Sequence, residues 1–260
     1  MKRVKCLVLV FLCLLVSINA IACNQTENNA SQKSENSADE QQAETNLRFY
    51  LVRHGQTYSN VKEICIASSG SAPLTQTGRL NAYYAGRGLA QENLDFLATY
   101  CSPLNRTYET AQYLLAGLDI EMPVTVESNL GDIVWGDMEL AYPDDFETLT
   151  GFDPSDYANL CGNANDPDFV SPVANAETTY EFVQRFEEGL KNIAEQHEGE
   201  TGNILVASHS TIGFYATKFT GEDPYGVPNT SVTMTAPLPY KRLYLLPRAR
   251  TLHPYTPLFE

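Results

Sequence analysis

Short apolar runs and longer amphipathic stretches follow one another along most of this chain. Runs rich in β-branched and aromatic residues predict strands at 47–52, 94–101, 124–126, 203–207, 231–236 and 242–246. Helical periodicity predicts helices at about 76–91, 104–117, 177–198 and 211–219. Because strands and helices alternate, we expect a three-layer α/β sandwich with a mostly parallel central sheet and a ligand crevice at the carboxyl ends of its strands.

The first 46 residues follow a different pattern. Three basic residues, Lys2, Arg3 and Lys5, precede an apolar run from Cys6 to Ile18, and Ala20-Ile21-Ala22 follows. This is the layout of a secretory signal. The run is shorter than the roughly 20 residues that span a bilayer, so residues 1–22 are expected to be removed on export; an uncleaved anchor reaching Ala22 is the alternative. Residues 24–46 are polar and contain no aromatic residue, which predicts a disordered tether. The folded domain is therefore expected at 47–260.

Cys23 stands directly after the small residues of this signal. The arrangement resembles the lipobox of bacterial lipoproteins, which implies a lipidated mature N-terminus and a protein anchored to the cell membrane or envelope. Cleavage by an ordinary signal peptidase after Ala22 is the alternative. With Cys6 and Cys13 in the signal, Cys65, Cys101 and Cys161 remain. Three cysteines cannot all pair within one chain; we expect small buried hydrophobes, with a Cys65–Cys161 bridge left open.

The charge balance limits the partners of the chain. The formal net charge is −15, and it becomes −18 once Lys2, Arg3 and Lys5 leave with the signal. Such a surface repels polyanions, and there is no basic stripe, so nucleic acid is not expected as a partner. There is also no spacing of Cys or His typical of a zinc site, and we predict neither a metal nor a cofactor.

Candidate chemistry lies just after three predicted strands. Arg53 and His54 end the first strand, and a neutral His54 could attack phosphorus while the always-charged Arg53 grips the phosphate. Ser102 is expected to cap a helix and Pro103 to be its first residue, so that Arg106 lies one turn inside this helix. His209 precedes Ser210-Thr211, the expected start of a helix whose N–H groups favour an anion. Together these residues offer the nucleophile, the positive charge and the hydrogen-bond donors that phosphoryl transfer needs.

In order, the motifs that carry this chemistry are LVRHGQT, Asn60, PLTQTGRLNA (73–82), SPLNRTYETA (102–111), LGDIVWGDME (130–139) and VASHS (206–210). This ordered set resembles the histidine phosphatase superfamily, in its phosphoglycerate mutase-like branch 1. The resemblance implies that His54 becomes a phosphohistidine and that Arg53, Arg106 and His209 form the phosphate pocket. It also places Asn60 and Ser210 at the phosphate and Thr57 in the loop that shapes the pocket.

The proton donor for the leaving group is where the chain departs from that family. Glu is usual two residues after the leucine that corresponds to Leu130, and Asp132 stands here, one methylene shorter. Asp132 is our candidate general acid, with Glu139 and Asp137 as alternatives. Ser210 also replaces a usual glycine, which leaves its backbone N–H in place. Trp135 is expected in the core, and His197 and His253 are expected to have no catalytic role.

The distribution of charge bears on the substrate. Residues 107–184 contain sixteen Asp and Glu and no Lys or Arg. Part of this stretch, about 133–176, is expected to fold over the site as a small cap. An acidic cap disfavours substrates with several phosphates or carboxylates and favours a phosphomonoester whose other half is neutral, aromatic or cationic; a merely solvated acidic face is the alternative.

The resemblance therefore implies a metal-independent phosphomonoester hydrolase that acts on a small phosphorylated molecule. Two alternatives stay open. A phosphoglycerate-type mutase would use the same residues and return the phosphoryl group to product. A non-catalytic surface lipoprotein could keep the pocket only to bind a phosphate ester.

Overall fold

The computed structural model describes residues 46–68, 70, 72–235 and 243–244. The predicted signal, lipidated Cys23, the tether up to residue 45 and His253 lie outside the described residues. Chain contacts separate residues 1–41 from a compact unit that begins at Gln42, and the fold below is that of this second unit. No helix among the described residues is long and apolar enough to cross a membrane.

A six-stranded sheet forms the middle layer, in the order β3-β2-β4-β1-β5-β6. The strands are β1 (Asn46–Arg53), β2 (Phe96–Cys101), β3 (Val124–Val126), β4 (Thr201–Ser208), β5 (Val232–Thr235) and β6 (Leu243–Tyr244). The first four are mutually parallel, whereas β5 and β6 are antiparallel additions beside β1. The predicted α/β class with a mostly parallel sheet is confirmed, and each predicted strand has a counterpart.

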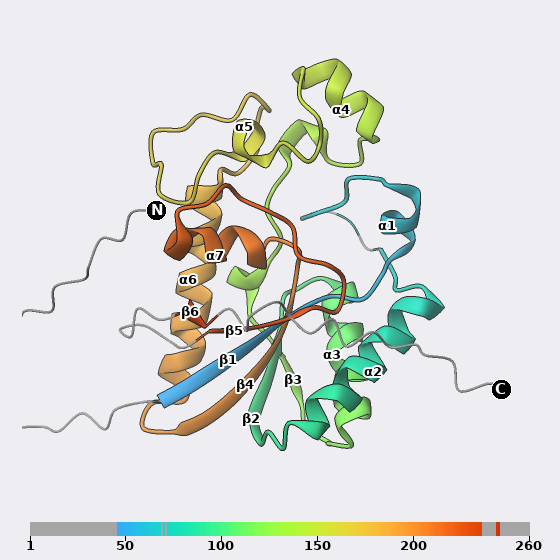
Figure 1. The fold of residues 1–260 in the computed structure, drawn as a ribbon, viewed down its shortest axis with the longest axis vertical. Coiled ribbons are helices and arrows are strands. Elements are labelled where there is room, and N and C mark those ends of the chain that lie inside the picture. Colours follow the sequence, from blue (N-terminus) through green and yellow to red (C-terminus); the bar gives the residue numbers. More distant parts are fainter. Residues whose placement is uncertain (1–45, 69, 71, 236–242, 245–260) are drawn as a thin grey trace, which may run out of the picture. The chain divides into compact units, whose positions relative to one another are not determined.

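Helices cover both faces of the sheet (Figure 1). On one side lie α2 (Gln76–Gln91) and α3 (Asn105–Leu118), and on the other α6 (Thr179–Gln196) and α7 (Ile212–Thr220). The alternation of side chains along β1 explains this. Leu47, Phe49 and Leu51 belong to the hydrophobic cluster that includes α6 and α7, whereas Tyr50 and Val52 belong to the cluster formed with α2 and α3. β1 is thus buried on both faces, as a central parallel strand must be.

Local signals set the helix boundaries. Thr75 caps α2, its hydroxyl oxygen accepting from the Gly78 N–H at 2.9 Å, and Thr178 with Glu181 forms a capping box at α6. The sequence pattern missed three short helices: α1 (Tyr58–Lys62), α4 (Pro143–Thr150) and α5 (Tyr157–Cys161). They span five to eight residues, too few to show a helical period.

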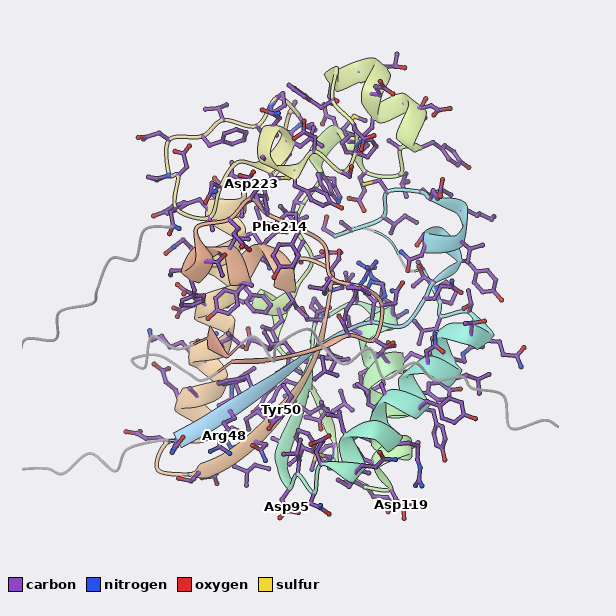
Figure 2. The ribbon with its side chains drawn as sticks, in the orientation of Figure 1. Arg48, Tyr50, Asp95, Asp119, Phe214 and Asp223 are labelled. Carbon is purple, nitrogen blue, oxygen red and sulfur yellow. The ribbon has the colours of Figure 1, made fainter. Side chains whose placement is uncertain are left out.

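The segment 133–176 lies beyond the carboxyl ends of the parallel strands (Figure 1). It contains a 3₁₀ turn (Gly136–Met138), α4 and α5, and we call it the cap. A second 3₁₀ turn, Ser128–Leu130, lies just before it. Phe214 on α7, labelled in Figure 2, lies at the same end of the sheet, and Asp95 and Asp119 lie at the other. The carboxyl ends of the strands and the cap therefore bound one region, where the candidate site is found.

Candidate active site

His54 directly follows β1 and is buried, with 4% of its surface exposed. Its backbone N–H donates to the Ser208 carbonyl at 2.8 Å, which ties the ends of β1 and β4 together. The ring nitrogen Nδ1 lies 2.8 Å from the Gly55 carbonyl oxygen. Because a carbonyl can only accept, Nδ1 carries the hydrogen, and the lone pair of the neutral ring is on Nε2. The backbone thus selects the tautomer that a nucleophilic His54 needs.

Close backbone packing requires glycine beside His54. A Cβ on Gly55 would lie 2.5 Å from the carbonyl oxygen of Gly78, which lies in the first turn of α2. The Gly55 N–H donates to the Thr110 hydroxyl on α3 at 3.0 Å. The loop after β1 is therefore held against both α2 and α3.

Arg106 reaches the site from the start of α3, with 2% of its surface exposed. Its Nη2 donates to the Ala67 carbonyl at 2.7 Å and to Asp132 Oδ2 at 3.2 Å, and Nη1 donates to the Gly70 carbonyl at 3.2 Å. The predicted start of this helix is wrong. α3 begins at Asn105 with Leu104 as its N-cap, so Arg106 lies in the first turn.

Ser102, the predicted cap of α3, has a different partner. Its hydroxyl lies 2.7 Å from His209 Nε2 and 3.0 Å from the Thr107 hydroxyl. It has no exposed surface, so it cannot act as a nucleophile towards a ligand. Ser102 is held by β2 and His209 by β4, and these strands are neighbours in the sheet. The hydroxyl therefore orients the His209 ring, a role that the sequence pattern did not identify.

Asp132 links these groups. Its Oδ2 lies 3.2 Å from Arg106 Nη2 and 3.4 Å from His209 Nδ1. Its Oδ1 accepts from the Thr211 hydroxyl at 3.0 Å and from the Ile133 N–H at 3.1 Å. With 8% of its surface exposed, the carboxyl group is nearly buried but still lines the cavity described below.

The two alternative acids lie elsewhere. Asp137 is exposed and accepts a hydrogen bond from Asn175 at 2.7 Å. Glu139 accepts from the Ala67 N–H at 2.7 Å, where it supports the loop that covers Arg106. Neither lines the cavity, so the structure brings Asp132, of the three candidates, to the histidines.

Both histidines are held in the neutral form. Burial is the main cause that lowers the pKa of His54 well below its usual value, followed by the charges of His209, Arg106 and Arg53. Burial also lowers the pKa of His209, with Arg106, Arg53 and Arg185 as further causes. The His54 and His209 ring centroids are 5.4 Å apart. Arg53 favours the neutral form of His54, but desolvation has the larger effect.

The remaining predicted residues surround this centre. Arg53 donates from Nη1 to the Val227 carbonyl at 2.5 Å, and its Nε is buried with no hydrogen-bond partner among the described residues. Thr57 caps α1, and its N–H donates to Asn60 Oδ1 at 3.1 Å. Thr57 thus shapes the loop, and Asn60 faces the cavity. Ser210 lines the cavity where α7 begins.

A cavity of about 340 Å³ opens over these residues. Arg53, His54, Asn60, Asp132 and Ser210 line it, together with aromatic and aliphatic side chains from the cap and α7. Arg106 and His209 lie behind Asp132 and do not line it. Trp135, expected in the core, packs against Phe146 but also lines the cavity. The arrangement joins a polar floor that includes Arg53, His54, Asn60 and Asp132 to a largely apolar upper part.

Sequence reasoning missed Arg185 of α6, which fixes the loop that carries Asp132. Its Nη2 donates to the Asp132 carbonyl at 3.1 Å, and Nη1 donates to the carbonyls of Asn129 and Gly131 at 2.8 and 3.1 Å. Glu177 binds the same guanidinium through both carboxylate oxygens, at 2.9 and 2.8 Å. The one sequence signal was that Arg185 ends the long stretch without Lys or Arg.

Other candidates remain apart from this centre. His197 closes α6, its Nδ1 2.6 Å from Glu200 Oε2 and its Nε2 3.1 Å from the Tyr100 hydroxyl. Cys65, Cys101 and Cys161 are all free thiols, so the bridge left open between Cys65 and Cys161 is not formed. Among the described residues there is no cluster of three or more His, Cys, Asp or Glu that could hold a metal ion.

The chain is similar in sequence to known proteins. The family model of the histidine phosphatase superfamily (branch 1) matches residues 49–237. Adenosylcobalamin/alpha-ribazole phosphatase of Escherichia coli is 30% identical over 166 residues, which cover 64% of this chain and 75% of that protein. A 2,3-bisphosphoglycerate-dependent phosphoglycerate mutase of Bartonella henselae is 35% identical over 89 residues, 32% of this chain and 43% of that protein.

A solved structure shares the fold. Phosphoglycerate mutase from Bacillus anthracis superposes with a TM-score of 0.62 at 23% identity, covering 75% of this chain and 89% of that one. At this identity the likeness supports the fold alone. The family match, in contrast, includes the strand ends that carry His54, Arg106 and His209.

Proposed function

The chain belongs to the histidine phosphatase superfamily (branch 1), and from this we propose that it hydrolyses small phosphomonoesters through a phosphohistidine on His54. The observation that carries the proposal is that His54 is held neutral, with its hydrogen on Nδ1. The Gly55 carbonyl holds the hydrogen on Nδ1, and burial among arginines keeps the ring neutral, so Nε2 presents a lone pair. No other described side chain in the cavity combines these properties.

The proposed reaction has two steps. His54 Nε2 attacks phosphorus, the bond to the leaving oxygen breaks, and Asp132 transfers a proton to that oxygen. Arg53, Arg106 and Asn60 stabilise the charge on the non-bridging oxygens, for which Arg106 exchanges its carbonyl partners for phosphate. A water molecule then attacks the phosphohistidine, Asp132 takes a proton from it, and inorganic phosphate leaves with His54 restored.

Trapping of the intermediate tests this proposal. Brief incubation with ³²P-labelled ester should leave label on the wild-type chain that survives alkali and is lost in acid, the behaviour of phosphohistidine. His54→Ala should carry no label and should not hydrolyse p-nitrophenyl phosphate, in the presence or absence of a chelator. Hydrolysis that persists in His54→Ala would contradict the proposal.

The same experiment separates the alternatives. A mutase would transfer label from one phosphoglycerate to another and release little inorganic phosphate. A binding protein would show neither label nor release, while phosphate esters would still raise its melting temperature. Hydrolysis is the better supported of these, because the phosphatase relative matches 64% of the chain, whereas the mutase relative matches 32% of it.

We further propose that the chain is a lipoprotein, exported and anchored to the bacterial cell membrane or envelope through Cys23. The support lies in residues 1–46, where a charged start, an apolar run and small residues precede Cys23 and a polar tether. Metabolic labelling with a fatty acid should mark the wild type and not Cys23→Ser. If both variants fractionate with membranes without lipid, an uncleaved anchor is the correct interpretation instead.

A further inference from the structure

The upper part of the cavity has a wall of four aromatic side chains that the proposed reaction does not use. They come from separate elements: Trp135 just before the 3₁₀ turn of the cap, Phe146 from α4, Tyr157 from α5 and Phe214 from α7. The wall is continuous. Trp135 meets Phe146 edge to face at 5.5 Å between ring centroids, and Tyr157 lies 6.1 Å from Trp135 and 5.0 Å from Phe214.

Two of these rings remain accessible. Phe146 and Phe214 are each 1% exposed and support the wall from behind, whereas Trp135 and Tyr157 are half-buried and keep free surface. An aromatic ring pairs favourably with another at centroid separations of about 4.5–7 Å, so an accessible Trp and Tyr offer a stacking surface. Aliphatic side chains complete the apolar lining: Ile64, Ile66, Ile133 and Pro154.

The wall adjoins the phosphate end of the site. Arg53 and Asp132 line the same cavity as Tyr157 and Trp135. A group bonded to a phosphate held by Arg53 would extend into the part of the cavity that Tyr157 and Trp135 line. The volume of about 340 Å³ is at the lower end of the roughly 300–1,000 Å³ of small-ligand sites, which suits a compact group.

The charges of the cavity exclude a second anionic group. Among the described residues that line it, Arg53 is the single Lys or Arg, and it already serves the phosphate. Glu63 and Asp132 are the acids of the lining. A second phosphate or a carboxylate in the upper part would lose its hydration without gaining a cation, which is costly.

We propose that the aromatic wall is a substrate-binding surface, and that the preferred substrate is a phosphomonoester whose alcohol carries a planar aromatic ring and no second anionic group, the ring stacking on Trp135 and Tyr157. This inference rests on the proposed function, since it uses the phosphate position set by His54 and Arg53. It makes Trp135 and Tyr157 the residues that determine specificity.

Three esters with similar leaving groups test the preference. Benzyl, cyclohexylmethyl and ethyl phosphate are all primary alkyl esters, so differences in kcat/KM report on the ring and not on the ease of departure. We expect benzyl phosphate to exceed ethyl phosphate by more than 10-fold, and to exceed cyclohexylmethyl phosphate by about 2- to 12-fold, the range of an aromatic pair beyond simple burial. Equal values for benzyl and cyclohexylmethyl phosphate would overturn the proposal.

Variants locate the effect. Trp135→Leu and Tyr157→Leu should lower kcat/KM for benzyl phosphate by a larger factor than for ethyl phosphate, which reduces the ratio of the two, while Trp135→Phe should retain much of the preference. The matched control is Tyr142→Leu, because Tyr142 is an aromatic residue of the cap that is 52% exposed and lies outside the cavity lining. If the Tyr142 change has the same effect, the wall does not select the substrate.

Binding can be followed without turnover, because Trp135 is the single tryptophan of the chain. In His54→Ala, benzyl phosphate should change the tryptophan emission saturably and at lower concentration than ethyl phosphate. Identical titrations for the two esters would overturn the inference. If the wild type hydrolyses none of the esters but this selective binding is present, the proposed function fails and the aromatic site stands.

Discussion

Asp132 shows how much a single side chain depends on its neighbours. Its two oxygens have different partners: Arg106 and His209 face Oδ2, and Thr211 and the Ile133 N–H hold Oδ1. A side chain shorter than the usual glutamate therefore still reaches His209. The sequence predicted Asp132, Asp137 and Glu139 as candidates, and of the three it is Asp132 that lines the cavity and lies 3.4 Å from His209 Nδ1.

We expect Asp132→Asn to lower activity in a way that depends on the leaving group. The amide cannot donate a proton to the departing oxygen in the manner of an acid, so kcat/KM for an alkyl phosphate should fall by about 10²- to 10⁴-fold. p-Nitrophenyl phosphate should be affected much less, since its phenolate leaves without protonation. Steady-state kinetics on both esters measure the difference, with the exposed Asp137→Asn as control. Equal losses on both esters would mean that Asp132 only positions Arg106 and His209.

At the scale of elements, α6 supports the site from the far side of the sheet. Arg185 donates to the carbonyls of Asn129, Gly131 and Asp132, and Glu177 orients its guanidinium. The helix itself follows from its sequence, which has a capping box and an apolar face that includes Phe182 and Phe186. That the helix also holds the acid loop follows only from the packing of α6 beside the turn at Ser128–Leu130.

Arg185→Ala should reproduce part of the Asp132 effect. Without the guanidinium the carbonyls of the loop lose their donors, and a displaced carboxyl group should lower kcat/KM for alkyl phosphates by about 10- to 100-fold, with a smaller loss for p-nitrophenyl phosphate. Lys191→Ala is the matched control, because it removes a cation of the same helix that is 56% exposed and pairs with exposed Glu188 and Glu195. A loss of kcat/KM that is independent of the leaving group would indicate that the substitution disturbs the active site as a whole instead.

At the scale of the whole molecule, two buried neutral histidines link stability to pH. The pKa of both His54 and His209 is lowered in the folded state, while an unfolded histidine titrates near 6.5. Above pH 6.5 neither state is protonated at these rings, and their full contribution to stability is present. Below it the unfolded chain binds protons that the folded chain does not, so stability is lost as the pH falls.

The free energy of unfolding should therefore decrease from pH 7.5 to pH 5, with a slope of up to about 1.4 kcal/mol per pH unit for each histidine. Urea denaturation across this range measures the slope. His209→Gln, which cannot take up a proton, should reduce it. A slope that is the same in the wild type and in His209→Gln would show that other groups cause the pH dependence.

The sequence by itself determined the alternation of strands and helices, the position of His54 at a strand end and the identity of the arginines and second histidine. These follow from local periodicity, caps and ordered motifs, which depend on near neighbours along the chain. The tertiary structure decided which distant side chains meet. The strand order β3-β2-β4-β1 brings Ser102 to His209, loop packing selects Asp132 over Asp137 and Glu139, and the cap turns Trp135 and Tyr157 towards the site. Such contacts depend on side-chain direction across elements, which no local pattern encodes.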